Sequence, residues 1–192
     1  MEIVVLSGAR SEKGQTGRAV KALVTGLSAG GARVAVRRLP EEKIERCRQC
    51  RDDGWGECID KGTCVIRDDD FASIAAAVRK ADAVVFATPV YWGDLAESLK
   101  AFLDRFRRTC THKDGKKGVA GKPALGLGVA GGGGGGSCEC MRRLEDTLHH
   151  CGFDVVDLVP TRRQNLELKL AVLELTGKWF AGKIGAEKAR SK

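Results

Sequence analysis

Aromatic residues are scarce in this chain of 192 residues, at 5% of the total with a single tyrosine. Proteins that bind nucleic acids often stack bases on aromatic rings, so the scarcity argues against nucleic acid as a partner despite a net charge of +8. We interpret the basic clusters as solvated faces and as an attraction for small molecules that carry phosphate.

Long apolar runs are also missing, since none approaches the roughly 18 residues that a membrane-spanning helix requires. The first residues, Met1-Glu2-Ile3-Val4, lack the basic and then apolar layout of a signal peptide. We therefore expect a cytoplasmic protein that does not bind a membrane. The length suits one domain with a real core, so we expect a single domain over residues 1–192, with a cysteine-rich insertion at about 46–67.

The stretch around which the chain is organised begins with a continuous apolar run, residues 83–87, that ends at Thr88-Pro89. Such a run predicts a strand buried on both faces. The following turn carries two aromatic rings, a glycine and an acid, and an amphipathic helix comes after it. The carboxyl end of a buried strand in an open α/β sheet is where such proteins bind ligands.

Strands and helices alternate along the whole chain, which indicates an α/β fold with right-handed crossovers. The expected strands cover residues 2–6, 33–38, 83–87, 123–130 and 153–159, and the last helix runs from Leu166 to about Ile184, before frayed basic residues. We expect a flavodoxin-like three-layer α/β/α sandwich with a five-stranded parallel sheet in the order 2-1-3-4-5.

The loop after the first strand, residues 7–17, is rich in glycine and hydroxyl groups and precedes a helix. Its N–H groups and the hydroxyls of Ser7, Ser11 and Thr16 meet near a positive helix end, and Arg10 adds a charge. Neither a GxGxxG fingerprint nor a P-loop is present, so the pattern favours a monophosphate over a pyrophosphate. The alternative interpretation is a polar loop that only caps the helix.

Six consecutive glycines, Gly131–Gly136, follow the fourth strand. A glycine run costs backbone entropy, which is reasonable where a flat ligand lies against the main chain and a Cβ would intrude. In the predicted sheet order this loop, the phosphate loop and residues 88–94 converge on one crevice. A ligand with a phosphate at one end and a planar heteroaromatic ring at the other fits the three loops, and FMN is such a ligand.

Four cysteines lie within a polar segment, as a C-x2-C pair followed by two single residues: Cys47, Cys50, Cys58 and Cys64. Three interpretations stay open. Four thiolates at compact spacing hold iron–sulfur clusters. A structural zinc site usually has two C-x2-C pairs, and the second pair is absent here. The third interpretation is a set of reduced or loosely paired thiols.

The chain resembles the NAD(P)H-dependent FMN reductases of flavodoxin fold, and specifically the iron–sulfur flavoproteins. The resemblance rests on Ser7-Gly8-Ala9-Arg10, on the TPVYWG sequence at 88–93 with LKAFLDR at 99–105, and on the cysteine pattern that ends in Asp68-Asp69. One departure is that Arg51-Asp52-Asp53 stands where the third cysteine is usual. The resemblance implies a possible [4Fe-4S] cluster on the four cysteines and FMN contacts from the following residues: Ser7, Arg10, Ser11, Gly14, Gln15, Thr16, Pro89, Val90, Tyr91, Trp92, Gly93, Asp94, Ala130, Gly131, Gly132, Gly133 and Gly134.

These features predict an oxidoreductase in which FMN takes hydride from NAD(P)H and reduces a quinone, flavin, metal or protein acceptor. The basic residues 113–122 are expected to meet the phosphates of the nicotinamide nucleotide, and the protein is expected to be a homodimer or homotetramer. The alternatives are an iron–sulfur flavoprotein or flavin carrier that passes single electrons to a protein partner. A regulatory protein that uses its basic surface and a cysteine redox switch is a third possibility.

Overall fold

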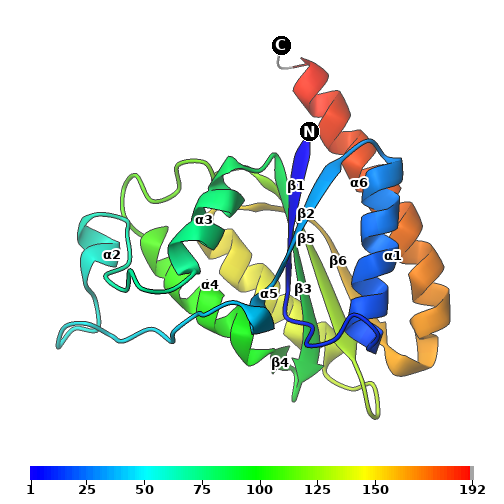
Figure 1. Ribbon diagram of the computed structural model, residues 1–192, viewed down its shortest axis with the longest axis horizontal. Helices are drawn as coiled ribbons and strands as arrows, with labels where there is room; N and C mark the ends of the chain where they lie inside the picture. Colours follow the sequence, from blue (N-terminus) through cyan, green and yellow to red (C-terminus); the bar gives the residue numbers. More distant parts are fainter. Residues whose placement is uncertain (191–192) are drawn as a thin grey trace.

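A computed structural model describes residues 1–190, and its centre is a parallel sheet between two layers of helices (Figure 1). The strands of this sheet are β1 (Glu2–Ser7), β2 (Arg33–Arg38), β3 (Ala83–Tyr91), β5 (Pro123–Ala130) and β6 (Asp154–Arg162). Their order is β2-β1-β3-β5-β6, with parallel pairing between neighbours. The predicted flavodoxin-like order is therefore confirmed.

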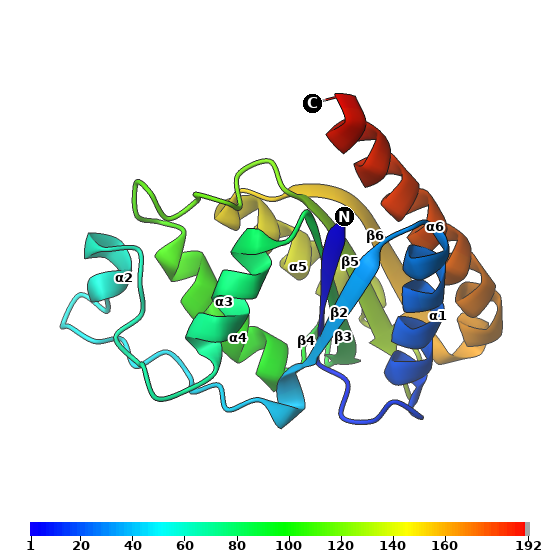
Figure 2. The ribbon, with the colours of Figure 1, turned by 45° about the horizontal axis from the view of Figure 1, so that its top comes forward.

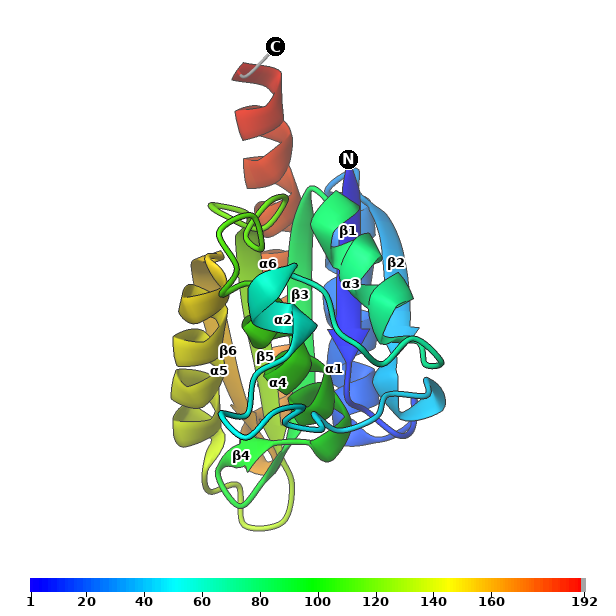
Figure 3. The same ribbon diagram turned by 90° about the vertical axis from the view of Figure 1, so that its left-hand side faces the viewer.

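The two helical layers are held by opposite faces of the same strands (Figure 3). One layer contains α3 (Phe71–Lys80), α4 (Glu97–Thr109) and α5 (Ser137–Cys151), and the other contains α1 (Gln15–Ala29) and α6 (Leu166–Arg190). Because side chains alternate along a strand, Val4 and Leu6 of β1 enter the first core while Ile3 and Val5 enter the second. This two-sided burial explains why the central strands are continuous apolar runs.

Strand β3 continues through Thr88-Pro89, where the sequence predicted its end. The extension exists because a small antiparallel strand, β4 (Asp94–Leu95), pairs with the end of β3. Trp92 and Gly93 form the two-residue turn between them, with φ values of 53° and 77°. Two central residues of positive φ are typical of the tight hairpin turn whose twist suits its strands.

The segment between β2 and α3 carries little regular structure and lies on the outer side of α4 (Figure 2). It contains the short helices η1 (Leu39–Glu41) and α2 (Glu57–Asp60), while a third short helix, η2 (Arg163–Asn165), precedes α6. Helix α6 extends to Arg190, past its predicted end, and the predicted fraying of residues 191–192 lies outside the described residues. Within residues 1–190, no helix combines the length and the apolar character needed to cross a bilayer.

Candidate cofactor site

Three loops meet at the carboxyl ends of β1, β3 and β5, at the lower end of the sheet in Figure 1. They enclose a crevice of about 1050 Å³, at the upper end of the size of ordinary ligand pockets. The residues that line it are Ala9, Arg10, Ser11, Gly14, Gln15, Thr16, Pro89, Val90, Tyr91, Trp92, Gly93, Val129, Ala130, residues 131–136 and Glu139. The convergence of the three loops, expected from the strand order, is present.

Two residues of the predicted FMN-binding set, Ser7 and Asp94, do not line the crevice. Ser7 is 2% exposed, and its hydroxyl accepts a hydrogen bond from the N–H of Ala9. Asp94 lies in β4, where its Oδ1 accepts a bond from the N–H of Leu95 at 2.8 Å. Both side chains therefore support the turns beside the crevice. The other residues of the predicted set do line it.

The start of α1 forms the end of the crevice that is suited to an anion. Gly14 precedes the helix without any side-chain cap, and the first turn carries no acid, so the N–H groups at the positive helix end are left for a ligand. The Oε1 atom of Gln15 is buried without a hydrogen-bond partner in the described chain. A buried polar atom without a partner is costly, and a bound group here would relieve that cost.

Arg10 differs from its expected role because its guanidinium already has an anionic partner. Its Nη2 lies 2.5 Å from Oε1 of Glu97, at the start of α4, and both side chains are exposed. The hydrogen bond from Arg10 holds the pKa of the Glu97 carboxyl below its ordinary value. A phosphate at this loop would compete with Glu97 for the guanidinium.

The glycine run forms the opposite wall of the crevice, where it touches the β3–β4 turn. Gly136 has a φ of +78°, and a Cβ at this position would stand 2.8 Å from the backbone of Gly93. Gly133 and Gly135 face open space, and the carbonyl of Gly133 accepts a bond from Gln164 at 2.9 Å. Bare backbone on an anchored loop offers a flat surface for a planar ring.

The aromatic rim of the crevice is strongly exposed. The exposed fraction is 47% for Tyr91 and 105% for Trp92, and Trp92 also has the positive φ that bulky residues rarely adopt. Strain of this kind persists only where the surrounding structure imposes it, and it clusters at ligand clamps and switch regions.

Five lining residues were not predicted: Ala9, Val129, Gly135, Gly136 and Glu139. The two glycines belong to the run that the sequence did single out. Glu139 gave no signal, because an acid in the first turn of a helix is ordinary. Its place at the crevice depends on contact between the start of α5 and the β3–β4 turn, where its Cβ lies near Gly93.

The basic residues 113–122 do not meet the crevice, so this expectation is wrong within one chain. The segment joins the end of α4 to the start of β5. It therefore lies at the end of the sheet where the parallel strands begin, opposite the crevice. The physical reason is topological: it precedes a parallel strand, whereas the crevice is built from loops that follow strands.

The four cysteines of the insertion, Cys47, Cys50, Cys58 and Cys64, line one small cavity together with Arg105 and Arg108 of α4. No residue lines both this cavity and the crevice. Within the described residues, no three His, Cys, Asp or Glu side chains come close enough together to hold a metal ion. As described, the four thiols are gathered at one cavity but are not arranged as the ligands of a single metal ion.

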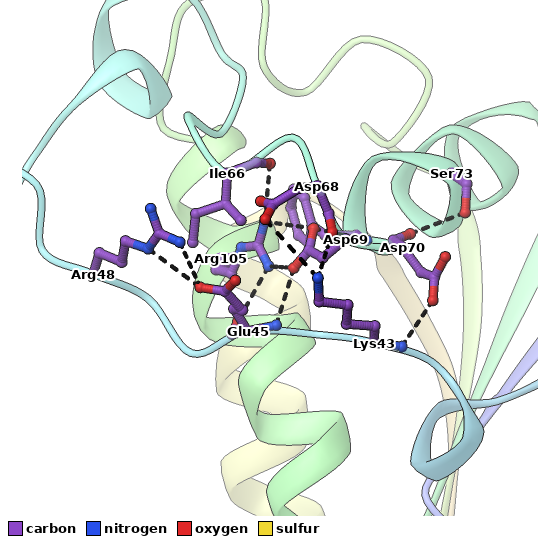
Figure 4. Close-up of polar contacts among 10 residues, drawn as sticks. Lys43, Glu45, Arg48, Ile66, Asp68, Asp69, Asp70, Ser73 and Arg105 are labelled. Carbon is purple, nitrogen blue, oxygen red and sulfur yellow. Dashed lines mark hydrogen bonds and ion pairs between the residues drawn. The ribbon is translucent and has the colours of Figure 1, made fainter.

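A buried ion pair joins this cysteine segment to α4 (Figure 4). Arg105 and Asp69 have side-chain exposures of 1% and 0%, and Arg105 also donates to the carbonyls of Glu45 and Ile66. Burial alone would raise the pKa of Asp69, but hydrogen bonds from Arg105 and from the N–H of Glu45 outweigh it and hold the pKa below its ordinary value. A guanidinium is therefore fixed beside the thiols.

Iron–sulfur flavoproteins are among the proteins to which this chain is similar. An iron–sulfur flavoprotein of Methanosarcina thermophila is 32% identical over 121 residues, covering 62% of this chain and 57% of the relative. One from Archaeoglobus fulgidus is 31% identical over 105 residues, covering 55% of this chain and 45% of the relative. The matched region thus spans about half the length of these relatives.

Solved structures share the fold. An NAD(P)H:quinone oxidoreductase from Methanothermobacter marburgensis superposes with a TM-score of 0.69 at 21% identity, covering 93% of this chain and 94% of the other. A flavodoxin from the domain Archaea gives a TM-score of 0.62 at 13% identity, covering 96% and 99% of the two chains. Residues 1–159 match the family described as NADPH-dependent FMN reductase. This protein, with its crevice at the carboxyl ends of a flavodoxin-like sheet, belongs to the NADPH-dependent FMN reductase family.

Proposed function

We propose that this protein is an FMN-dependent oxidoreductase that takes reducing equivalents from NAD(P)H and passes them to a separate acceptor, a quinone, flavin, metal or protein. The observation that carries the proposal is the crevice itself, which joins an uncapped helix start, two exposed aromatic rings and a bare glycine wall. Bound FMN would supply the hydride chemistry.

The residues of the chain bind and orient in this proposal. Ser11, Thr16 and the N–H groups at the start of α1 hold the phosphate, and the partnerless Gln15 gains a neighbour. The backbone of residues 131–136 would lie against the ring of FMN and would limit the access of water to that face of the ring. Tyr91 and Trp92 cover the rim, and the open space beside Gly133 and Gly135 leaves room for a nicotinamide.

Visible absorbance of the purified protein after incubation with FMN tests the first step, and bleaching of the bound flavin by NADPH or NADH without oxygen tests the second. Thr16→Val removes one hydroxyl at nearly constant volume and should weaken FMN binding about tenfold, as expected for loss of a hydrogen bond to a charged group. Thr25→Val on the exposed side of α1 is the matched control. A protein that stays colourless with added FMN contradicts the proposal.

A second candidate is favoured by one observation, that all four cysteines of the insertion line one cavity beside three arginines. In that case the segment would close around an iron–sulfur cluster and the protein would pass single electrons to a protein partner. Metal sites often form together with the fold of a polar loop. Iron, sulfide and zinc analysis of protein prepared without oxygen separates the cluster, a zinc ion and free thiols. Metal-free protein would contradict this second candidate.

We also expect the homodimer or homotetramer predicted from the resemblance. The fully exposed Trp92 at the crevice rim supports it, because a partner subunit would cover the ring. Light scattering of the purified protein measures the mass directly.

A further inference from the structure

A hollow of about 540 Å³ lies near the amino ends of the strands, at the end of the sheet opposite the crevice. It is bounded by the C-terminal end of α3, by the loop that follows α4, and by Lys61 and Gly62 after α2. We call it the basic hollow after the side chains that line it: Lys61, Arg79, Lys80, His112 and Lys117, with Asp114 as the one carboxylate. The cofactor proposal leaves this surface without a role.

The wall of the basic hollow is fixed by hydrogen bonds and close packing. One terminal nitrogen of Arg79 donates to the carbonyls of Gly115 at 2.5 Å and of Lys117 at 3.0 Å, and the other donates to the hydroxyl of Thr109. A Cβ at Gly115 would stand 1.9 Å from the carbonyl oxygen of Thr109, so the loop lies directly on the end of α4. Arg79 and the main chain of the loop are therefore held in place before any ligand arrives.

The C-terminal end of a helix carries a partial negative charge, but at α3 the partly buried Lys122 already compensates it. The Nζ atom of Lys122 donates to the carbonyls of Val78 at 2.7 Å and Arg79 at 2.8 Å, and also to that of Ala81. Lys122 does not line the hollow. The lysines that do line it are therefore not required to neutralise these carbonyls.

Several donors in the basic hollow have no acceptor. Lys80 and Lys117 form no ion pair within residues 1–190, whereas Lys61 is paired with Glu57 at 3.3 Å. His112 accepts the N–H of Asp114 at its Nδ1 atom, which leaves Nε2 for another partner. Like charges gathered in one hollow repel each other until an anion neutralises them.

We propose that the basic hollow binds a small phosphate-bearing anion of the pyrophosphate or nucleotide class. A phosphate offers several strong acceptor oxygens to the two lysines and His112. The volume exceeds the need of one phosphate and lies within the range of small-molecule sites. Because Lys61 and Gly62 belong to the cysteine segment, a bound anion would also steady that segment.

The proton NMR signals of His112 provide a direct readout, since the chain has only three histidines. Inorganic pyrophosphate is titrated at fixed neutral pH and low salt into protein saturated with FMN, so that the phosphate loop of the crevice is filled. If FMN does not bind, the same titration is run without it, because the His112 signal reports the hollow alone. A second arm uses ADP, which distinguishes a nucleotide from a bare phosphate group.

The expected result is a saturable shift of the His112 signals and about tenfold weaker binding in Lys117→Glu and in Lys80→Glu. Lys178→Glu on α6 makes the same change of charge at an exposed position outside the hollow and should bind like the parent. Equal affinity in Lys117→Glu and Lys178→Glu would overturn the proposal. So would a shift produced by polyglutamate and not by pyrophosphate or ADP, which would assign the surface to an acidic protein.

Discussion

The crevice and the cysteine segment are both cofactor candidates, yet they are built in different ways. The crevice consists of main chain and small residues at the ends of strands whose positions the sheet fixes. The cysteine segment has almost no regular structure and depends on side chains, above all on the buried pair of Arg105 and Asp69. We infer that the crevice is most sensitive at its glycines and at the start of α1, whereas the cysteine segment depends on a few charged groups.

The largest effect is expected from Asp69→Asn, which leaves the buried Arg105 without its anion. Removing one partner of a buried ion pair costs about 3–5 kcal/mol. Hydrogen exchange of amides 45–67 should accelerate strongly while FMN affinity changes less than about twofold, because no residue lines both cavities. Asp146→Asn, at an exposed pair with Arg142, should cost about 0–1 kcal/mol. Equal loss of FMN binding and of segment protection would show that the two regions are one unit.

Low pH should weaken the stabilisation that the Arg105–Asp69 ion pair provides. The pKa of Asp69 is held below its ordinary value of 3.8, so its contribution to the free energy of unfolding is complete above that pH and is lost as pH falls through the lower, folded value. The difference in unfolding free energy between the parent and Asp69→Asn should therefore shrink below about pH 4. Chemical denaturation at a series of pH values measures this difference, and a constant gap would contradict the assignment.

Gly136→Ala should lower the affinity of the crevice for FMN and leave the conformation of the cysteine segment unchanged. The new methyl group would meet the backbone of Gly93 at 2.8 Å, and the φ of +78° is unfavourable for alanine. Strain of this kind costs about 1–3 kcal/mol, so FMN affinity should fall by about 5- to 100-fold. Gly121→Ala is the matched control and should bind FMN normally, because Gly121 has a similar φ of +70°, has open space where the Cβ would stand, and does not line the crevice. Fluorescence titration with FMN compares the two variants.

A smaller effect is expected from Glu139→Gln. Removing this carboxylate from the lining of the crevice should tighten the binding of the anionic FMN by about two- to threefold at low salt, and the gain should vanish at high salt. Glu145→Gln, on the same helix and outside the crevice lining, is the control. Titrations at two salt concentrations measure the difference, and a salt-independent change would assign Glu139 a structural role.

The sheet order and the meeting of the three loops could be predicted because both follow from local patterns. Apolar runs mark buried strands, alternation with helices requires parallel pairing, and parallel pairing brings the loops that follow strands to one edge. The same patterns placed Gly14, Thr16 and Tyr91 at the crevice. The three loops together suggested FMN, and the family resemblance added NAD(P)H as the electron donor.

The orientation of individual side chains could not be predicted. Ser7 turns into the protein to bond Ala9, Arg10 finds Glu97 across 87 positions of sequence, and Glu139 reaches the crevice through contact of α5 with the β3–β4 turn. Residues 113–122 were assigned to the phosphates of the nicotinamide nucleotide from charge alone, although the topology puts them at the end of the sheet where the strands begin.

The sequence by itself determined which segments are strands, which loops meet at one end of the sheet, and which thiols share a segment. These properties follow from hydrophobic periodicity, from glycine content and from the spacing of the cysteines, which are patterns that extend over a few residues. Only the tertiary structure decided that Arg105 is fixed beside the four thiols by Asp69, and that unpaired lysines gather in a hollow far from the crevice. Such pairings depend on distances between residues remote in the chain, which become defined only when the helices pack on the sheet.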